Sequence, residues 1–209
     1  MPTKAGKSSG SNNTRNEILR VATELMIKHG YRGTNFRTIA EKVGITTTNI
    51  HYHFGGKDSL VEHVVKAFVA EAIARQHAIW ANDSLTIREK LQAVVDSHRV
   101  RYLKYNKSKS KNRPWTLIGR LRMEMDALSL KTQKDLMQFP IQLQKDIERA
   151  VDMAIQRGEL KSDAPASAIV IVLLAIANSS AAIAADVGFE QLEYLYQSTG
   201  ELIASAYGR

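Results

Sequence analysis

Apolar residues recur at intervals of three and four along almost the whole chain. Ile18, Ala22, Leu25 and Met26 share one such face, which ends just before Gly30. This spacing is typical of an amphipathic helix, and glycine is the residue that most often ends one. No stretch of any length alternates apolar and polar residues as a strand does. The pattern therefore predicts an all-α protein.

Two short helices are expected after this first one. Thr34 is placed as the N-cap of a helix that buries Ile39, and Thr46 as the N-cap of another that runs to about Tyr52. Gly44 lies between the two helices, where the chain needs a tight turn.

Six longer helices are expected in the rest of the chain. They cover about residues 57–80, 86–105, 114–128, 131–156, 163–185 and 190–207, which gives nine helices in all. Thr86 and Glu89 form a capping-box pattern, Pro114 suits a first helical turn, and Asp163 is placed as an N-cap. Pro140 is expected to kink or split its helix.

The segment from Ala164 to Ala185 contains 22 residues without a charge. That length is sufficient to cross a bilayer about 30 Å thick. The segment also contains Asn178 and several serines, and it lacks aromatic residues at its ends. A helix that is apolar on all sides also suits a bundle centre or a subunit interface, and we favour the interface. Its members would be Leu192, Leu195, Tyr196, Leu202 and Ile203 from the final helix, joined by Ile176 from this segment if Ile176 faces the partner.

Composition narrows the class of protein. The 209 residues include 29 Lys and Arg against 21 Asp and Glu, a net charge of +8, and no cysteine. A disulfide framework, a thiol nucleophile and a cysteine-bound zinc are thereby excluded. Residues 1–13 are polar, so we expect a flexible basic arm rather than a signal peptide, and a cytoplasmic protein. The positive charge makes nucleic acid the first partner to consider.

The charge is concentrated in two stretches. Residues 1–60 contain nine Lys and Arg against four acids, and residues 99–113 contain seven Lys and Arg with no acid. Three interpretations of the second stretch stay open. It is a solvated helix end and loop, it lines the entrance of a pocket for an anionic ligand, or it makes an additional contact with DNA.

The two short helices around Gly44 have the form of a helix-turn-helix. Ile39, Ala40, Ile45 and Ile50 would bury the inner faces of these helices. The outer face of the second one is short and polar, and it remains free to enter a major groove about 12 Å wide.

The identities of the residues at 14–65 indicate more than a helix-turn-helix in general. The carrying features are Gly30-Tyr31 followed by Thr34, then Ile39-Ala40-Glu41, Val43-Gly44-Ile45 and the run Ile50-His51-Tyr52-His53-Phe54. The stretch resembles the DNA-binding region of the TetR family of bacterial transcription regulators, and it covers about a quarter of the chain.

The resemblance implies a homodimer with one helix-turn-helix in each subunit. Residues 14–56 would form the DNA-binding domain, and residues 57–209 a larger helical domain that binds a small molecule. The last two helices of the family build the dimer interface, which corresponds here to about 164–185 and 190–207.

The chain departs from the family inside the expected recognition helix. Thr47 stands where the family usually has lysine, and Thr48 where it has glycine or another small residue. His51 replaces a tyrosine that commonly touches a phosphate, so that this contact becomes weaker or dependent on pH. These changes affect the expected operator rather than the fold.

Nine residues are candidates for contact with DNA. They are Thr34, Arg37, Thr46, Thr47, Thr48, Asn49, His51, Tyr52 and Lys57. The alternatives are an N-cap role for Thr46, partial core packing for Tyr52 and a solvated surface for the others. Because residues 46–53 contain no Arg or Lys, we expect threonine methyl groups to meet thymine and Asn49 to pair with adenine. His51 and His53 have no acid or cysteine nearby, so we expect no metal site.

An effector pocket is expected in the larger domain. Its candidate lining residues are Trp80, His98, Trp115, Met123, Phe139 and Asn178, although the apolar ones also suit an ordinary core. The chain contains no Gly-rich phosphate loop, G-x-S-x-G or H-E-x-x-H motif, so neither an enzyme nor a cofactor is expected.

The sequence thus predicts a DNA-binding transcriptional regulator, a repressor released from a palindromic operator by a small-molecule effector. The long helix from Lys57 to Trp80 would act as a lever between the two sites, since its residues span ~35 Å. The alternatives are a structural or protein-recruiting DNA-binding protein without an effector, and a transcriptional activator.

Overall fold

The computed structural model describes residues 7–107 and 113–208. These residues form the helices α1 (Lys7–His29), α2 (Phe36–Val43), α3 (Thr47–Phe54), α4 (Lys57–Trp80), α5 (Ile87–Tyr105), α6 (Leu117–Arg122), α7 (Leu130–Gln156), α8 (Ala166–Asp186) and α9 (Phe189–Tyr207), with the 3₁₀ helix η1 (Met125–Ala127) before α7. Within the described ranges the only β pairing is an isolated bridge between Leu160 and Gly208. The prediction of an all-α protein with nine α-helices is confirmed.

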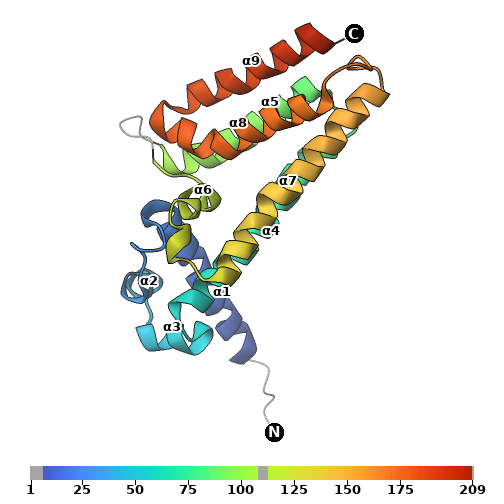
Figure 1. The fold of residues 1–209 in the computed structure, drawn as a ribbon. Coiled ribbons are helices and arrows are strands. Elements are labelled where there is room, and N and C mark those ends of the chain that lie inside the picture. The colour runs from blue at the N-terminus through green and yellow to red at the C-terminus, as the bar shows by residue number, and fades with distance from the viewer. Residues whose placement is uncertain (1–6, 108–112, 209) are drawn as a thin grey trace.

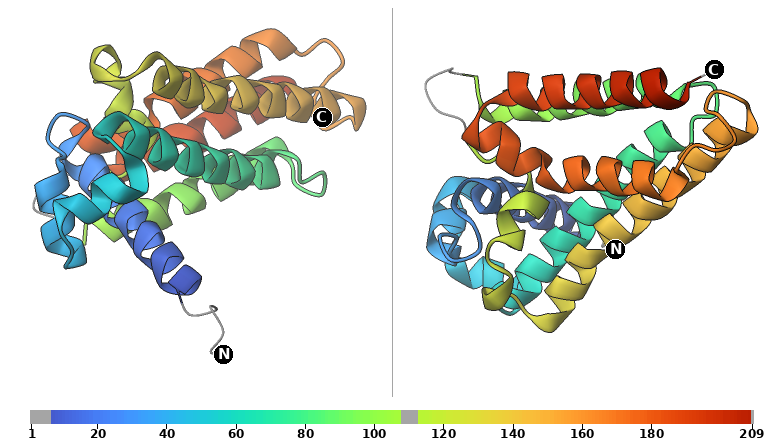
Figure 2. Two further views of the ribbon diagram at one scale, coloured as in Figure 1. Left: turned by 90° about the horizontal axis from the view of Figure 1, so that it is seen from below. Right: turned by 45° about the horizontal axis from the view of Figure 1, so that its top comes forward.

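The molecule is elongated, with α1, α2 and α3 at one end and α5, α8 and α9 at the other (Figure 1). The long helices α4 and α7 lie side by side and connect the two ends (Figures 1 and 2). The short helix α6 lies at the junction, where it contacts α1, α4 and α8. Two neighbouring elements, α4 and α6, therefore touch both ends of the protein.

Buried apolar residues form two cores, and α4 contributes to both. The core at the α1–α3 end includes Ile18, Ile39 and Ile50 together with α4 residues as far as Ala72. The other core begins with Trp80 at the end of α4. The expected domain division after residue 56 stays a prediction, because the first core continues through α4 beyond that point.

Several helix ends are those that the sequence predicts. Helix α4 has the expected bounds. Helix α7 runs through Pro140 as one helix, so the expectation that Pro140 splits it is wrong. Thr46 and Thr86 are the N-caps of α3 and α5, each in a reciprocal capping box with the residue three positions on. In both cases the cap is local, because the side chains satisfy N–H groups within the same turn.

Two predictions about the first helices are wrong. Helix α1 begins at Lys7 instead of after residue 13, because no proline interrupts its hydrogen bonds before His29. The N-cap of α2 is Asn35, whose Oδ1 accepts a hydrogen bond from the Thr38 N–H at 2.9 Å, and not Thr34. The part of the expected arm at residues 1–6 lies outside the described residues.

Two later helix starts also differ from the prediction. Helix α6 is much shorter than expected, and Pro114 precedes it outside the helix, because the chain buries Trp115 before Thr116 begins the turn. Helix α8 begins after Pro165, and Asp163 remains exposed in the preceding turn without capping it.

Candidate DNA-binding surface and effector pocket

Helix α3 is fixed by a tight turn and a cap. Gly44 has a φ of +76°, the left-handed region that glycine adopts without strain, and its N–H donates to the Ala40 carbonyl. Thr46 then opens α3, and its hydroxyl accepts a hydrogen bond from the Asn49 N–H. The inner side chains Ile50 and Phe54 are buried, so one face of α3 is held against the core and the other faces outward.

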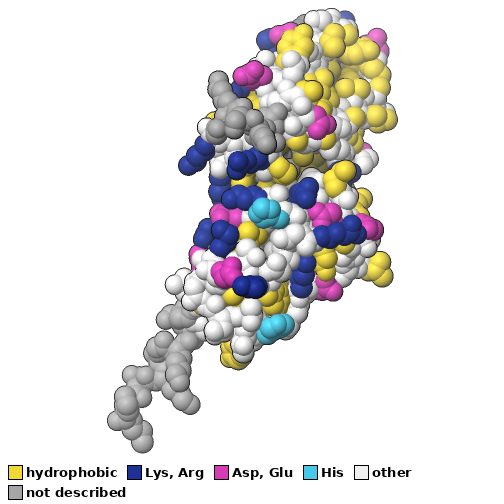
Figure 3. All heavy atoms as spheres, turned by 90° about the vertical axis from the view of Figure 1, so that its left-hand side faces the viewer, with side chains coloured by type: hydrophobic (Ala, Val, Ile, Leu, Met, Phe, Trp, Pro, Cys, Tyr) yellow, Lys and Arg dark blue, Asp and Glu magenta, His cyan; other side chains and the backbone are white. Residues whose placement is uncertain are grey.

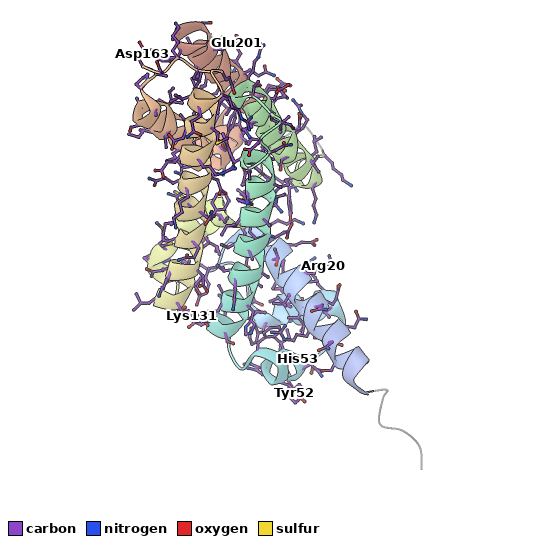
Figure 4. The ribbon with its side chains drawn as sticks, turned by 90° about the vertical axis from the view of Figure 1, so that its right-hand side faces the viewer. Arg20, Tyr52, His53, Lys131, Asp163 and Glu201 are labelled. Carbon is purple, nitrogen blue, oxygen red and sulfur yellow. The ribbon has the colours of Figure 1, made fainter. Side chains whose placement is uncertain are left out.

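The outward face of α3 is polar and carries no lysine or arginine. Its exposed residues are Thr47, Thr48, Asn49, His51 and Tyr52. Tyr52 is 82% exposed and projects from the tip of the molecule, at the opposite end from Asp163 (Figure 4). Tyr52 therefore does not pack in the core, which was the alternative role.

The side chain of Asn49 is hydrogen-bonded within the N-cap of α3. Its Oδ1 accepts hydrogen bonds from the Thr46 hydroxyl at 2.6 Å and from the Thr46 N–H at 3.3 Å. A paired contact with adenine uses both the oxygen and the nitrogen of an asparagine amide. Because the oxygen is engaged in the cap, only the amide N–H groups of Asn49 remain to meet a base.

His51 is oriented by hydrogen bonding and ring packing. Its Nδ1 lies 2.7 Å from the Gly55 carbonyl oxygen, so Nδ1 carries the proton and donates. Its ring meets that of Phe36 edge-on, with centroids 4.8 Å apart. The neutral ring therefore leaves Nε2 as an acceptor, and only a protonated His51 can donate to a phosphate from that atom.

Two cationic candidates flank α3. Arg37 lies exposed on α2 and pairs with Glu41 at 3.0 Å. The Lys57 ammonium lies 4.1 Å from the ring centre of Tyr31, and partial burial lowers its pKa. Tyr31 in turn donates from its hydroxyl to Asp58, and this bond raises the pKa of Tyr31 to about 12.

Thr34 was expected on this surface, and that expectation is wrong. The residue is buried, and its hydroxyl donates to the Gly30 carbonyl at 2.8 Å. Thr34 thus stabilises the turn that ends α1 and cannot reach DNA.

A cavity of about 70 Å³ lies at the other end of the molecule, lined by residues of α4, α5, α6, α7, α8 and α9. Five of the six expected pocket residues line it, namely Trp80, His98, Trp115, Phe139 and Asn178. Met123 does not, because it follows the last turn of α6 with its side chain outward and 82% exposed. Arg75, Arg101 and Tyr196 also line the cavity. The sequence did not single out Arg75, it placed Tyr196 in the subunit interface, and it offered Arg101 only as part of a basic stretch at a pocket entrance.

Aromatic rings form one wall of the cavity. The His98 ring meets Trp115 at 5.1 Å and Tyr196 at 6.2 Å, both in edge-on contacts. The Tyr196 hydroxyl lies 2.9 Å from the Ser180 hydroxyl, and burial raises the pKa of Tyr196 to about 12. Burial and the nearby cations of Arg101 and Arg75 lower the pKa of His98 to about 3, so His98 is neutral at pH 7.

The second basic stretch divides between surface and cavity. Arg99 pairs with Glu193, and Lys104 lies 3.7 Å from Glu24, so both are surface ion pairs. Arg101 lines the cavity, with its guanidinium 4.9 Å from the ring centre of Phe68. Residues 108–112 of the stretch lie outside the described residues.

Helix α6 and η1 tie the cavity wall to the DNA-binding end. Arg122 of α6 lines the cavity, and Glu124 follows it two residues later. The Glu124 Oε2 accepts a hydrogen bond from the Arg32 N–H at 2.9 Å, and the Arg32 guanidinium donates to Asp126 at 2.5 Å. Arg32 lies in the turn between α1 and α2, so these two bonds connect the segment after α6 to the DNA-binding end.

Apolar residues are exposed on the outer faces of α8 and α9. They are Ile171, Val172, Tyr194 and Leu202, and hydrophobic side chains gather at the upper right of Figure 3, where α8 lies. Leu192, Tyr196, Ile203 and Ile176 were expected to face a partner, and they are instead buried inside the protomer. These residues lie on the inner faces of their helices. Helix α8 packs against α7, and α9 packs against α5.

By length and composition, α8 could cross a bilayer, and 33% of its most apolar stretch is buried. Core helices of proteins outside membranes pass the same test. In the described part of the chain, no three His, Cys, Asp or Glu side chains are grouped to bind a metal ion.

The helix-turn-helix region matches a known family. Residues 18–64 match the family of bacterial regulatory proteins described as the tetR family. The chain is 32% identical over 94 residues to the HTH-type transcriptional repressor KstR2 of Rhodococcus jostii, which covers 45% of this chain and 46% of that protein. It is 31% identical over 68 residues to KstR2 of Mycobacterium tuberculosis, covering 34% of that protein. These alignments thus span half or less of the length of the curated relatives.

Solved structures share the fold over nearly the whole chain. A TetR-family transcriptional regulator from Agrobacterium tumefaciens has a TM-score of 0.79 at 21% identity, over 92% of this chain and 98% of that one. A TetR regulator from Chloroflexus aurantiacus has a TM-score of 0.77 at 18% identity, over 96% and 98%. At such identities the likeness establishes the arrangement of the helices.

Proposed function

The chain belongs to the TetR family of bacterial transcriptional regulators, and we propose that it is a repressor, released from a palindromic operator when a small molecule occupies the cavity. The cytoplasm, where such an operator lies, is its proposed location. The observation that carries this proposal is that α4 and α6 each contact the DNA-binding end and line the cavity. The cavity favours an effector over the effector-free alternative.

The proposed DNA contacts come from α3 and its flanks. Thr47, Thr48 and Asn49 would face bases, whereas Tyr52 would reach the backbone or the groove wall. Arg37 and Lys57 would meet phosphates, which position the helix without reading sequence. Without a guanidinium on α3 the half-site should be read through thymine methyl groups and through acceptors that the Asn49 amide can reach.

The proposed dimer uses the exposed faces of α8 and α9. Ile171, Val172 and Leu202 lie on these faces, where monomeric proteins seldom leave a continuous apolar area. A two-fold axis there would present two α3 helices to successive half-sites about 34 Å apart. Two-fold symmetry of the protein then requires a palindromic operator.

Release would follow from movement of α4 and α6. At 1.5 Å per residue, the 24 residues of α4 span ~35 Å, so a tilt at Trp80 is carried to Lys57. Through Glu124, α6 provides a second connection to Arg32. A hundredfold release requires the ligand to prefer the tilted state by ~2.7 kcal/mol.

Selection of binding sites from random duplex DNA tests the proposal. We expect pseudo-palindromic sites with A·T pairs opposite α3. Tyr52→Ala should weaken binding to every selected site, whereas Met123→Ala, at an equally exposed residue away from α3, should leave binding unchanged. Asymmetric sites, or sites that depend strictly on guanine opposite α3, would contradict the proposal.

A further inference from the structure

The charges that line the cavity are all positive at neutral pH. Arg75 comes from α4, Arg101 from α5 and Arg122 from α6. None of the described residues that line the cavity is acidic, and His98, which lies among them, is neutral. Three cations from separate helices thus line a space whose described lining contains no counter-charge.

The three arginines differ in how far they are already engaged. Arg75 pairs with Glu71 at 2.5 Å, and Arg122 donates to the Asn178 Oδ1 at 2.9 Å. The ion pairs found among the described residues include none for Arg101, whose guanidinium lies over the ring of Phe68. Burial and repulsion from Arg75 lower the pKa of Arg101 to about 10, which leaves it charged at pH 7.

A buried charge without a partner is unfavourable, and burial is tolerated where an opposite charge is supplied. Arg101 has no carboxylate at hydrogen-bonding distance among the described residues, although Glu71 lies close enough to influence it. An anion bound in the cavity would complete this site. The anion would stabilise the charge of Arg101 most, because Arg75 and Arg122 already have partners within the protein.

A second, independent observation points to the same occupant. The indole N–H of Trp115 has no hydrogen-bond partner, although Trp115 is only 2% exposed and lines the cavity. Buried donors of this kind are rare in native proteins. His98 lies close to both the arginines and the unpaired indole. Its ring contacts Trp115, and burial together with the charges of Arg101 and Arg75 lowers its pKa.

The rest of the lining is apolar. Phe68, Trp80, Phe139 and Leu143 offer hydrocarbon and aromatic surface, but no charge. We infer that the effector is an amphipathic organic anion, whose single anionic group binds between Arg101, Arg75 and the indole N–H of Trp115 and whose apolar body packs against Trp80 and Phe139. This inference rests on the proposed role of the cavity as the effector site.

The size of the cavity connects binding to release. Sites for drug-sized ligands have volumes of about 300–1,000 Å³, well above the 70 Å³ present here. The occupant must therefore displace part of the wall. A Cβ at Gly119 of α6 would come within 2.6 Å of Ala181, so α6 is packed closely against α8 and must move with it or away from it.

A pair of fluorescent probes tests the inference on the full-length protein. Anilinonaphthalene sulfonate carries one anionic group, and phenylnaphthylamine is the same molecule without it. The chain has two tryptophans, Trp80 and Trp115, and both line the cavity, so quenching of their emission reports its occupancy. We expect the sulfonate to bind at least ~10-fold more tightly than the neutral probe, as one charge-assisted contact allows.

Variants of α5 locate the anionic group. Arg101→Met keeps a long apolar side chain but removes the charge, and it should abolish the preference for the sulfonate. Arg101→Lys should restore part of it. Lys104→Met, which removes a surface cation from the same helix, is the matched control and should behave as the wild type.

The outcomes separate this inference from the proposed function. If both probes quench the tryptophans equally, and Arg101→Met changes neither affinity, the anionic effector is excluded while the cavity remains an effector site. If neither probe quenches them at any concentration, the effector cavity itself is contradicted. If Arg101→Met weakens both probes equally, Arg101 acts through packing, and the inference is likewise overturned.

Discussion

The DNA-binding end and the cavity use polar groups in opposite ways. Helix α3 presents Thr47, Thr48 and Asn49 to solvent without a single lysine or arginine, although DNA is a polyanion. The cavity is lined by the partly buried Arg75 and Arg101, and a charge is costly to keep where water is partly excluded. Neutral groups on α3 suit the reading of base edges, which carry sequence information. The arginines that line the cavity suit the recognition of an opposite charge.

The two ends also differ in how their geometry is determined. The shape of α3 follows from contacts within a few residues, such as those between Thr46 and Asn49. The cavity is assembled from six helices, and its parts lie up to about 130 residues apart in the sequence, from Phe68 to Tyr196. Changes at the first end should therefore act locally, and changes at the second should act through packing.

Loss of the dimer should have the largest effect on DNA binding. Ile171→Asp places a charge on the exposed outer face of α8, where Ile171 is 65% exposed in the protomer. The variant should fold as a monomer and lose operator affinity by ~10²–10⁴-fold, because two linked half-site contacts become one. Sedimentation and operator titration measure both effects.

Val100→Asp is the matched control for this variant. Val100 is also an exposed aliphatic residue, but it lies on α5 and not on the proposed interface helices α8 and α9. It should leave both dimer and affinity intact. A wild-type protein that sediments as a monomer at micromolar concentration would refute the proposed assembly. Ile176 is unsuitable for this test, since its side chain is buried and a charge there would disrupt the core.

The next effect concerns the connection through α6. Glu124→Ala removes the acceptor of the Arg32 N–H, so the cavity wall loses one of its links to α1. We expect the coupling between probe and operator to weaken by about 0.5–2 kcal/mol. The coupling is the ratio of the affinities of anilinonaphthalene sulfonate with and without bound operator, which linkage makes reciprocal.

Lys131→Ala is a control for Glu124→Ala, because it removes a different contact of a carboxylate, the ion pair with Glu62 between α7 and α4, and this contact involves neither α1 nor α6. An unchanged coupling in Glu124→Ala would assign transmission to α4 alone. A Gly-Gly insertion after Phe68 is a poor test of that lever, since Phe68 and Val69 are buried on α4 and the insertion would displace the core.

The sequence predicts more of the DNA-binding end than of the cavity, because local contacts determine the first and contacts between distant residues determine the second. Gly44 and Thr46 could be placed correctly because turns and caps depend on neighbouring residues. Thr34 was misplaced by one position, since only the fold shows that its hydroxyl turns inward. In the larger domain the aromatic lining could be anticipated from residue type. Arg101 could not, because a run of cations gives no sign of which one is buried.

The interface helices illustrate a further limit. Helix α8 is apolar on every side, so periodicity cannot distinguish the face that packs in the protomer from the face left outside. Ile176 and Ile171 are alike in sequence terms, and yet one is buried and the other exposed. The short α6 was also beyond sequence reasoning, because burial of Trp115 determines where that helix starts.

A smaller effect should appear in the pH dependence of stability, at the cavity end alone. The pKa of His98 is lowered to about 3, below the value near 6.5 of an unfolded histidine. As the pH falls from 6.5 towards 3, the unfolded chain binds a proton that the folded chain does not, so stability falls with it. The slope from this residue should be about 1 kcal/mol per pH unit, and full stability should hold above pH 6.5.

His98→Asn should flatten this slope, and denaturant unfolding at pH 5 and pH 7 measures it. His29→Asn is the matched control, because it makes the same substitution at an exposed residue at the end of α1, outside the cavity. Equal slopes in the wild type and in His98→Asn would show that His98 takes up its proton in the folded protein as readily as in the unfolded one.

The smallest effect is expected from removing an N-terminal capping box, a motif that occurs at both ends of the molecule. Thr46 with Asn49 caps α3, and Thr86 with Glu89 caps α5 in the same reciprocal arrangement. Thr46→Ala and Thr86→Ala should each lower the free energy of unfolding by about 1 kcal/mol, because each removes one N-cap. Only Thr46→Ala should also change DNA binding, because it removes the shorter of the two bonds to the Asn49 Oδ1 and leaves only the 3.3 Å bond from the backbone N–H of residue 46, so the amide can turn more easily towards a base. Operator selection with that variant should then show a stronger preference for adenine opposite Asn49, while Thr86→Ala keeps the wild-type sites. If both variants change the selected sites alike, the change arises from lost stability. The claim that only the cap at the DNA-binding end affects base recognition would then be wrong.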